Sequence, residues 1–163
     1  MLKKAIGIML CLFMLTGCAA VNTFEQIEDV YAQTEQISPK EIKITLPPDA
    51  GTTVLAGETG RLYFCEGYEI TIETYPSGDL EQTMKHLTGY ARNDIAVIRT
   101  SEADELERYE LVWTAAGDEG ETVGRSVIID DGAYHYCICL TALSVEAGSL
   151  QETWRDILRT VSV

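Results

Sequence analysis

Four strand-like segments in a row, separated by very short joints, constrain this chain more than any other feature of its sequence. The last joint is Asp131-Gly132, a dipeptide that favours the tight turn of a β-hairpin. Antiparallel strands can be joined by such short connections, whereas parallel strands need a long crossover. The sequence therefore predicts an antiparallel meander built from DIAVIRT (94–100), LERYELVWTAA (106–116), ETVGRSVIID (121–130) and AYHYCICLTAL (133–143).

Three more strands are expected before this meander. Apolar and polar residues alternate over residues 42–46, and Pro47-Pro48 then stops the pattern. A hairpin is expected from residues 61–65 and 68–75, which turn at Glu66-Gly67.

A mid-chain helix is expected between the hairpin and the meander. Leu80, Met84 and Leu87 follow one another at helical spacing, and either Ser77 or Asp79 is suited to the amino-terminal cap. Gly89 is suited to end the helix, since glycine readily adopts the left-handed conformation found there.

A second helix is expected at the end of the sequence. Ser149 and Glu152 match the capping-box pattern at its predicted start. One apolar stripe follows at helical spacing and must be buried against the sheet: Leu150, Trp154, Ile157, Leu158 and Val161.

Together these elements predict an α+β fold: an antiparallel sheet of about seven strands with a mid-chain helix and a carboxyl-terminal helix packed on it. Over residues 40–163 this order of elements resembles the Mog1/PsbP-like fold. The segments that carry the resemblance are IKITLPPD, YEITIETYPSGDLEQTMKHL and the closing WRDILRTV. The resemblance implies a domain that binds partners, because members of that fold, which include small bacterial lipoproteins, mostly bind partners and share no single chemistry.

The amino terminus has the pattern of an export signal. Lys3 and Lys4 precede eleven uncharged residues, AIGIMLCLFML, a run too short to span a bilayer, which takes about 20 residues. Leu15-Thr16-Gly17-Cys18 then resembles the lipobox of bacterial lipoproteins. This resemblance implies cleavage before Cys18 and a diacylglyceryl group on its sulfur. An ordinary signal peptide with a chance cysteine is the alternative.

The chain is accordingly divided into a lipoprotein signal peptide (1–17), a lipidated amino terminus and tether (18–40), and a single α+β domain (41–163). A short helix is expected around residues 24–31 of the tether. Two acyl chains hold a protein firmly on a membrane, so a diacylglyceryl group needs no basic patch to assist it.

The charge of the chain excludes some partners. Its formal charge is −14, and loss of Lys3 and Lys4 with the signal makes it −16. Nucleic acid is not expected as a partner, since binding to phosphates needs clustered Lys and Arg. The expected partners are the membrane, through the lipid anchor, and an envelope protein or small ligand.

Three cysteines remain after Cys11 is removed and Cys18 is lipidated. His135, Cys137 and Cys139 should share one face of a strand, and a neighbouring Cys65 would complete a weak candidate site for zinc or copper. C-x-C along a strand places the sulfurs about 6–7 Å apart, which suits neither shared tetrahedral ligation nor a mutual disulfide. Buried free thiols are the leading interpretation, and a disulfide through Cys65 is the second.

No catalytic motif is present. His86 and His135 are the chain's two imidazoles, and the acidic segments do not match a calcium-binding loop. We expect no cofactor, no resident metal and no enzymatic activity. The favoured interpretation is a lipid-anchored, extracytoplasmic binding or adaptor domain of unknown ligand. A structural accessory subunit of an envelope complex and a metal- or thiol-dependent enzyme are the alternatives.

Overall fold

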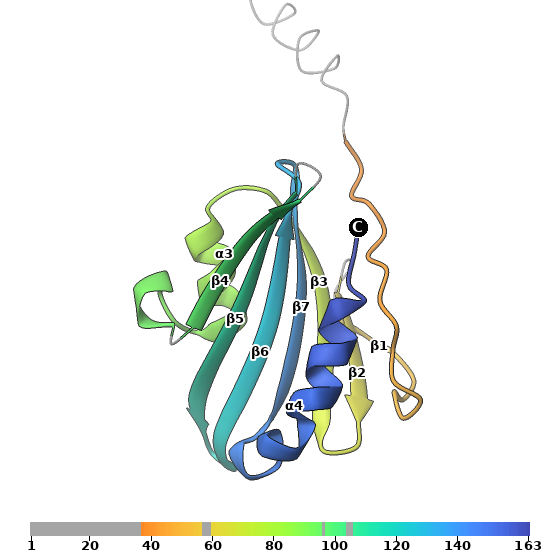
Figure 1. The fold of residues 1–163 in the computed structure, drawn as a ribbon, viewed down its shortest axis with the longest axis vertical. Coiled ribbons are helices and arrows are strands. Elements are labelled where there is room, and N and C mark those ends of the chain that lie inside the picture. Colours follow the sequence, from red (N-terminus) through yellow and green to blue (C-terminus); the bar gives the residue numbers. More distant parts are fainter. Residues whose placement is uncertain (1–36, 57–59, 96, 104–105) are drawn as a thin grey trace, which may run out of the picture. The chain divides into compact units, whose positions relative to one another are not determined.

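Seven strands form one antiparallel sheet in the order β1-β2-β3-β7-β6-β5-β4 (Figure 1). The computed structural model describes residues 37–56, 60–95, 97–103 and 106–163. The strands are β1 (Val54–Ala56), β2 (Gly60–Cys65), β3 (Tyr68–Pro76), β4 (Val97–Ala103), β5 (Leu106–Gly117), β6 (Gly120–Asp130) and β7 (Tyr134–Leu143). The helices are α3 (Leu80–Thr88), the short 3-10 helix η1 (Arg92–Asp94) and α4 (Ser144–Arg159). The predicted α+β class with one mid-chain and one carboxyl-terminal helix is confirmed.

One of the seven predicted strands is wrong. The hairpin and the meander form as expected and supply six strands, whereas residues 42–46 make only one isolated bridge, from Lys43 to Ser162. A three-residue strand, β1, lies at the edge of the sheet beside β2.

The alternation of residues 42–46 nevertheless has a structural cause. Ile42, Ile44 and Leu46 pack against the core, although the segment joins no strand. Its backbone is held by the end of the chain: Lys43 exchanges two hydrogen bonds with Ser162, of 2.9 and 3.1 Å. The alternation of apolar and polar residues therefore comes from an extended segment that buries one side against the core without joining the sheet.

The two faces of β7 pack into separate cores. Tyr136, Ile138 and Leu140 belong to a cluster that includes Trp154 of α4. Cys137 and Cys139 belong to a second cluster, which includes Met84 of α3. Because neighbouring residues of a strand point to opposite faces, α4 and α3 cover opposite faces of the sheet.

The predicted ends of α3 are confirmed. The Asp79 side chain accepts a hydrogen bond of 2.9 Å from the N–H of Glu81, as an amino-terminal cap. Gly89 adopts φ 79° and donates its N–H to the Lys85 carbonyl. Within the described part of the chain, no helix is long and apolar enough to cross a membrane.

The capping box predicted for the last helix is wrong. α4 begins at Ser144, after Leu143, so Ser149 lies inside it and donates its hydroxyl to the Glu146 carbonyl. The predicted apolar stripe is confirmed by the burial of Trp154 and its neighbours along the helix. Because β7 leads directly into α4, the helix begins before the predicted cap at Ser149.

Arg108 of β5 stabilises the end of α4. Its guanidinium donates to the carbonyls of Leu158 at 2.7 Å and Val161 at 3.3 Å, and it also pairs with Glu110. A cation at this position complements the partial negative charge of the helix end.

Asp131 holds the first residues of the compact unit Ser38–Val163 to the β6–β7 hairpin. Its carboxylate lies 3.0 Å from the Lys40 ammonium and accepts a hydrogen bond from the Tyr136 hydroxyl, which in turn accepts the Lys40 N–H. Burial alone would raise the pKa of Asp131, but these donors and the N–H groups of Tyr134 and Ala133 lower it to about 2. The hairpin thus fixes where the chain enters the domain.

Trp113 of β5 lies directly over Gly124 of β6. A Cβ at Gly124 would fall 2.1 Å from a ring carbon of Trp113, far inside contact distance. The indole N–H donates to Ser126, whose hydroxyl lies 3.1 Å from the Cys139 sulfur. Glycine at this position lets the ring lie flat on the sheet.

We predict that Gly124→Ala lowers the free energy of unfolding by about 2–3 kcal/mol, since the new methyl group must displace the Trp113 ring. Urea unfolding followed by Trp fluorescence would measure it. Gly148→Ala is the control, because nothing lies within 4 Å of its Cβ position inside α4. It should stabilise the protein by about 0.5–1 kcal/mol. Equal effects of the two changes would contradict the packing described.

Candidate functional site

Three of the four candidate residues lie together on the α3 face of β7. His135, Cys137 and Cys139 are 1%, 1% and 6% exposed, so the predicted shared face is confirmed. They lie beneath α3 and the neighbouring side chains of β5 and β6, so little of their surface reaches solvent.

Cys65 does not join this group. It packs against the α4-side core, on the opposite face of the sheet from Cys137 and Cys139. All three thiols are free, so the disulfide alternative through Cys65 is not formed. Across the part of the chain that the structure describes, no three His, Cys, Asp or Glu side chains are grouped to hold a metal ion.

The buried thiols are poor nucleophiles. Burial raises the pKa of Cys137 far above its ordinary value, and the nearby Glu73 carboxylate raises it further. Burial also raises the pKa of Cys139, to about 11, despite the hydrogen bond from Ser126. Since the thiolate is the reactive form, neither sulfur is activated at neutral pH.

His135 links α3 to the sheet. Its Nδ1 lies 2.8 Å from the Thr83 hydroxyl, and its Nε2 lies 3.4 Å from the Asp130 carboxylate without a hydrogen-bonding geometry. The hydrogen bond between Thr83 and Nδ1 ties α3 to β7. This arrangement positions a helix and presents no free imidazole to a substrate.

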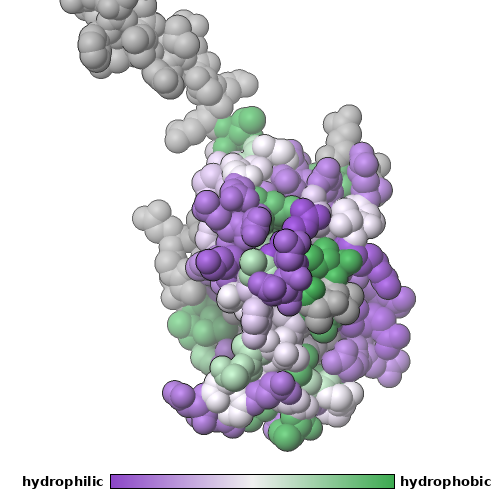
Figure 2. Space-filling model, turned by 90° about the vertical axis from the view of Figure 1, so that its left-hand side faces the viewer, coloured by the Kyte–Doolittle hydropathy of each residue, from purple (hydrophilic) through white to green (hydrophobic). Residues whose placement is uncertain are grey.

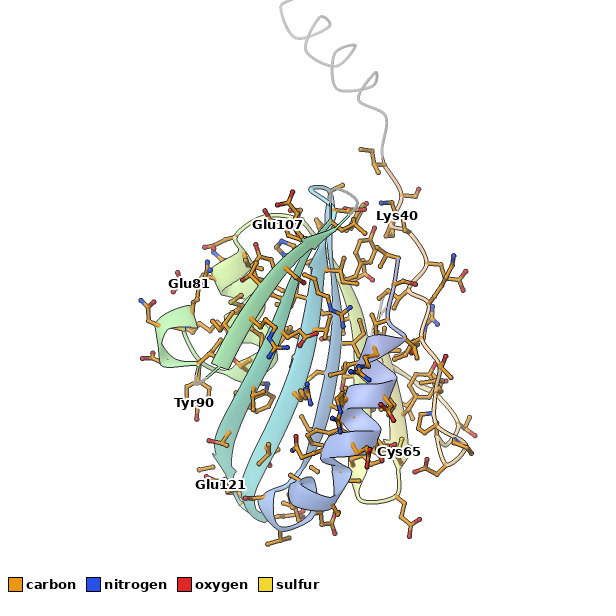
Figure 3. The ribbon with its side chains drawn as sticks, in the orientation of Figure 1. Lys40, Cys65, Glu81, Tyr90, Glu107 and Glu121 are labelled. Carbon is orange, nitrogen blue, oxygen red and sulfur yellow. The ribbon has the colours of Figure 1, made fainter. Side chains whose placement is uncertain are left out.

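A cavity of ≈ 450 Å³ lies at the end of the domain formed by the β2–β3 turn, the β5–β6 turn and the first turn of α4. We call it the distal cavity, because Lys40 lies at the opposite end of the sheet from Cys65 and Glu121 (Figure 3). It is lined by Phe64, Cys65, Gly67, Tyr68, Glu69, Glu119, Thr122, Thr141, Ala142, Leu143 and Glu146.

The distal cavity combines apolar and acidic surface. Phe64 is 50% exposed, which leaves a large apolar side chain in solvent. Glu69, Glu119 and Glu146 supply three carboxylates. The volume falls within the range of about 300–1,000 Å³ that is usual for ligand-binding sites.

A second cleft of ≈ 360 Å³ lies between α3 and the end of β3. His86 stacks edge-on against Tyr75 there, with ring centroids 5.2 Å apart, and its Nε2 lies 3.8 Å from a Glu73 oxygen. The His86 imidazole is thus already in contact with Tyr75 and close to Glu73. Figure 2 shows mostly hydrophilic residues on the side of the molecule that it presents, with hydrophobic ones in small separate groups.

No feature of the sequence indicates the distal cavity. Its carboxylates come from β3, the β5–β6 turn and α4, which are separated by up to 77 positions along the chain. No linear motif brings them together. The turn GDEG (117–120) was visible only as polar turn material.

Comparison with known proteins identifies no family for this chain. No protein-family model and no curated protein matches the chain. A solved structure of PA94 from Pseudomonas aeruginosa, a protein of unknown function, is similar with 13% identity and a TM-score of 0.46. The match covers 79% of this chain and 87% of that one, and an overlap of this quality identifies no shared function.

We predict that Cys137 and Cys139 resist thiol reagents in the native protein and react once it is unfolded in urea, because burial and the raised pKa both protect them. Cys65, which is only half-buried, should react faster than either. Mass spectrometry after timed alkylation would locate the modified sulfurs. A chelator should change nothing; rapid native-state labelling of Cys137 or Cys139, or labelling that depends on the chelator, would contradict this account.

Proposed function

We propose that this protein is a membrane-anchored, extracytoplasmic lipoprotein whose domain binds a ligand or partner. The Leu15-Thr16-Gly17-Cys18 pattern, which lies outside the described residues, supports the anchor and its attachment at Cys18. The open distal cavity is the observation that carries the binding role. The resemblance to the Mog1/PsbP-like fold stays a prediction and agrees with a partner-binding domain.

The attachment of the chain to the domain supports this arrangement. Lys40 is tied by its backbone to Tyr136 and by its side chain to Asp131, at the β6–β7 end of the sheet. The distal cavity lies at the opposite end, where Cys65 and Glu121 are found (Figure 3). Within the unit Ser38–Val163, Lys40 and the cavity therefore lie at opposite ends of the sheet.

We favour binding over a thiol-dependent reaction for chemical reasons. A reactive cysteine needs a lowered pKa and access to solvent, whereas burial raises the pKa of Cys137 and Cys139. Burial also raises the pKa of Cys65, and the nearby Asp49 carboxylate adds to the shift in part.

The anchor is tested by Cys18→Ser. We expect the variant to accumulate as an uncleaved precursor or in soluble fractions, because it lacks the sulfur that would carry the two acyl chains. Membrane fractionation and intact mass would measure this, with Cys65→Ser as the control that should mature like the parent. A Cys18→Ser protein that matures and fractionates like the parent would exclude the proposed anchor.

The binding role is tested by photocrosslinking in intact cells. A photoreactive amino acid at Phe64, which lines the distal cavity, should give one or a few discrete adducts. The same group at Tyr90, an exposed aromatic position away from the cavity, should give far fewer. Adducts chiefly from Tyr90 would favour the alternative of a structural subunit docked elsewhere, and would contradict a role for the cavity.

A further inference from the structure

A small cavity of ≈ 150 Å³ lies beside β5, where this strand extends beyond its neighbour β4. The first residue of β4, Val97, pairs with Val112, so among the described residues β5 has no strand on its outer side after that point. We call this space the aromatic cavity, and it is lined by Tyr90, Asp94, Trp113 and Thr114. It shares no lining residue with the distal cavity, and Figure 3 shows Tyr90 on the left of the view and Cys65 on the right.

Trp113 provides a fixed aromatic surface. Its ring lies over Gly124, where a Cβ would fall 2.1 Å from a ring carbon, so one face of the ring is against the sheet and the other points away from it. The indole N–H already donates to the Ser126 hydroxyl at 3.2 Å. The indole therefore offers the aromatic cavity π surface and no free donor.

Tyr90 provides a second ring from the end of α3. It follows Gly89, the residue that ends the helix, and its N–H donates to the Thr88 hydroxyl at 3.1 Å. Its side chain is one of the large apolar groups that the domain leaves exposed. In the described residues neither Tyr90 nor Trp113 stacks on another aromatic ring, so the π surface of both remains available.

Asp94 adds one negative charge to these two rings. Its backbone is fixed in η1, where its N–H donates to the Ala91 carbonyl at 2.9 Å. Its carboxylate takes part in none of the ion pairs of the described residues. No Lys or Arg lines the aromatic cavity, since Arg92 of the same turn lies near Tyr109 instead. The charge of Asp94 is therefore free to attract a cation.

The composition of the aromatic cavity favours a methylated ammonium group over a primary one. A primary ammonium carries three donor hydrogens, and one carboxylate offers too few acceptors to replace the water around them. A trimethylammonium group has no donors, and aromatic faces attract its charge. The volume lies below the range of about 300–1,000 Å³ usual for larger ligands, which indicates that a head group enters and the rest of the ligand stays outside.

We infer that the aromatic cavity binds the head group of a quaternary ammonium compound. The rings of Trp113 and Tyr90 contact its methyl groups, and the Asp94 carboxylate balances its charge. This site goes beyond the proposed function and does not depend on the distal cavity. The same trimethylammonium chemistry occurs in a free cationic solute and in the head group of a choline lipid.

Calorimetry with choline tests the inference on the mature chain, purified from membranes in a non-ionic detergent and kept at constant ionic strength. Choline should bind saturably and change the fluorescence of Trp113, whereas Trp154 is fully buried in the other core and should not respond. The control ligand is 3,3-dimethylbutan-1-ol, which has the shape of choline without its charge. It should bind at least about tenfold more weakly. Absence of saturable choline binding, or equal binding of the neutral alcohol, would overturn the inference.

Glycerophosphocholine distinguishes the two sources of the head group, because it is the polar part of a choline lipid without the acyl chains. Binding of both probes would assign the site to a lipid head group. Binding of choline alone would assign it to a free cationic solute, since the phosphate is repelled by Asp94. Neither probe forms a protein adduct, so this measurement is independent of crosslinking from position 90.

Matched variants show whether the binding takes place in the aromatic cavity. Tyr90→Ala and Asp94→Asn should each raise the Kd of choline by about threefold to tenfold, whereas Tyr90→Phe keeps the ring and should bind like the parent. The control for charge is Asp118→Asn, an exposed position in the β5–β6 turn that does not line the cavity. All four positions of change are exposed, so the thermal midpoint should stay close to that of the parent. Equal effects of Asp94→Asn and Asp118→Asn, or an unchanged Kd in Tyr90→Ala, would overturn the site.

Discussion

The burial of β7 on both faces is the constraint on which the rest of the structure depends. Every residue from His135 to Leu140 is buried, although the sheet is antiparallel and could have left one face in water. The even-numbered side chains require a cover, which α4 provides, and the odd-numbered ones require another, which α3 provides in part. Because β3 and β6 pair with β7 on either side, the register of the central strand sets which of their residues are buried.

Several elements could be predicted because their signals are local. The hairpin turns at Gly67 and Gly132, both with positive φ, were visible as Glu66-Gly67 and Asp131-Gly132. The caps of α3 at Asp79 and Gly89 were visible for the same reason. A turn or a cap is decided by the few residues that form it, so tertiary contacts do not easily change it.

Other elements could not be predicted because distant contacts decided them. Residues 42–46 alternate like a strand, yet the nearest backbone available to them is the tail at Ser162, which offers one bridge in place of a ladder. Ser149 and Glu152 match a capping box, yet the helix begins at Ser144. The distal cavity could not be predicted for the same reason, since its lining comes from β2, β3, the β5–β6 turn, β6, β7 and α4, and no motif marks any of them.

The number of carboxylates in the sequence does not indicate what each of them does. The hydrogen bonds and ion pairs that each one makes in the structure do indicate it. Asp131 is surrounded by an ammonium, a hydroxyl and two N–H groups, so its negative charge is used within the fold, and its pKa is lowered to about 2. Asp79 caps a helix, and Glu110 pairs with Arg108. Glu69 and Glu119 have no comparable donors and face a cavity that holds no basic residue. In a chain with 26 acidic residues, the hydrogen bonds and ion pairs of a carboxylate thus identify the ones that serve the fold.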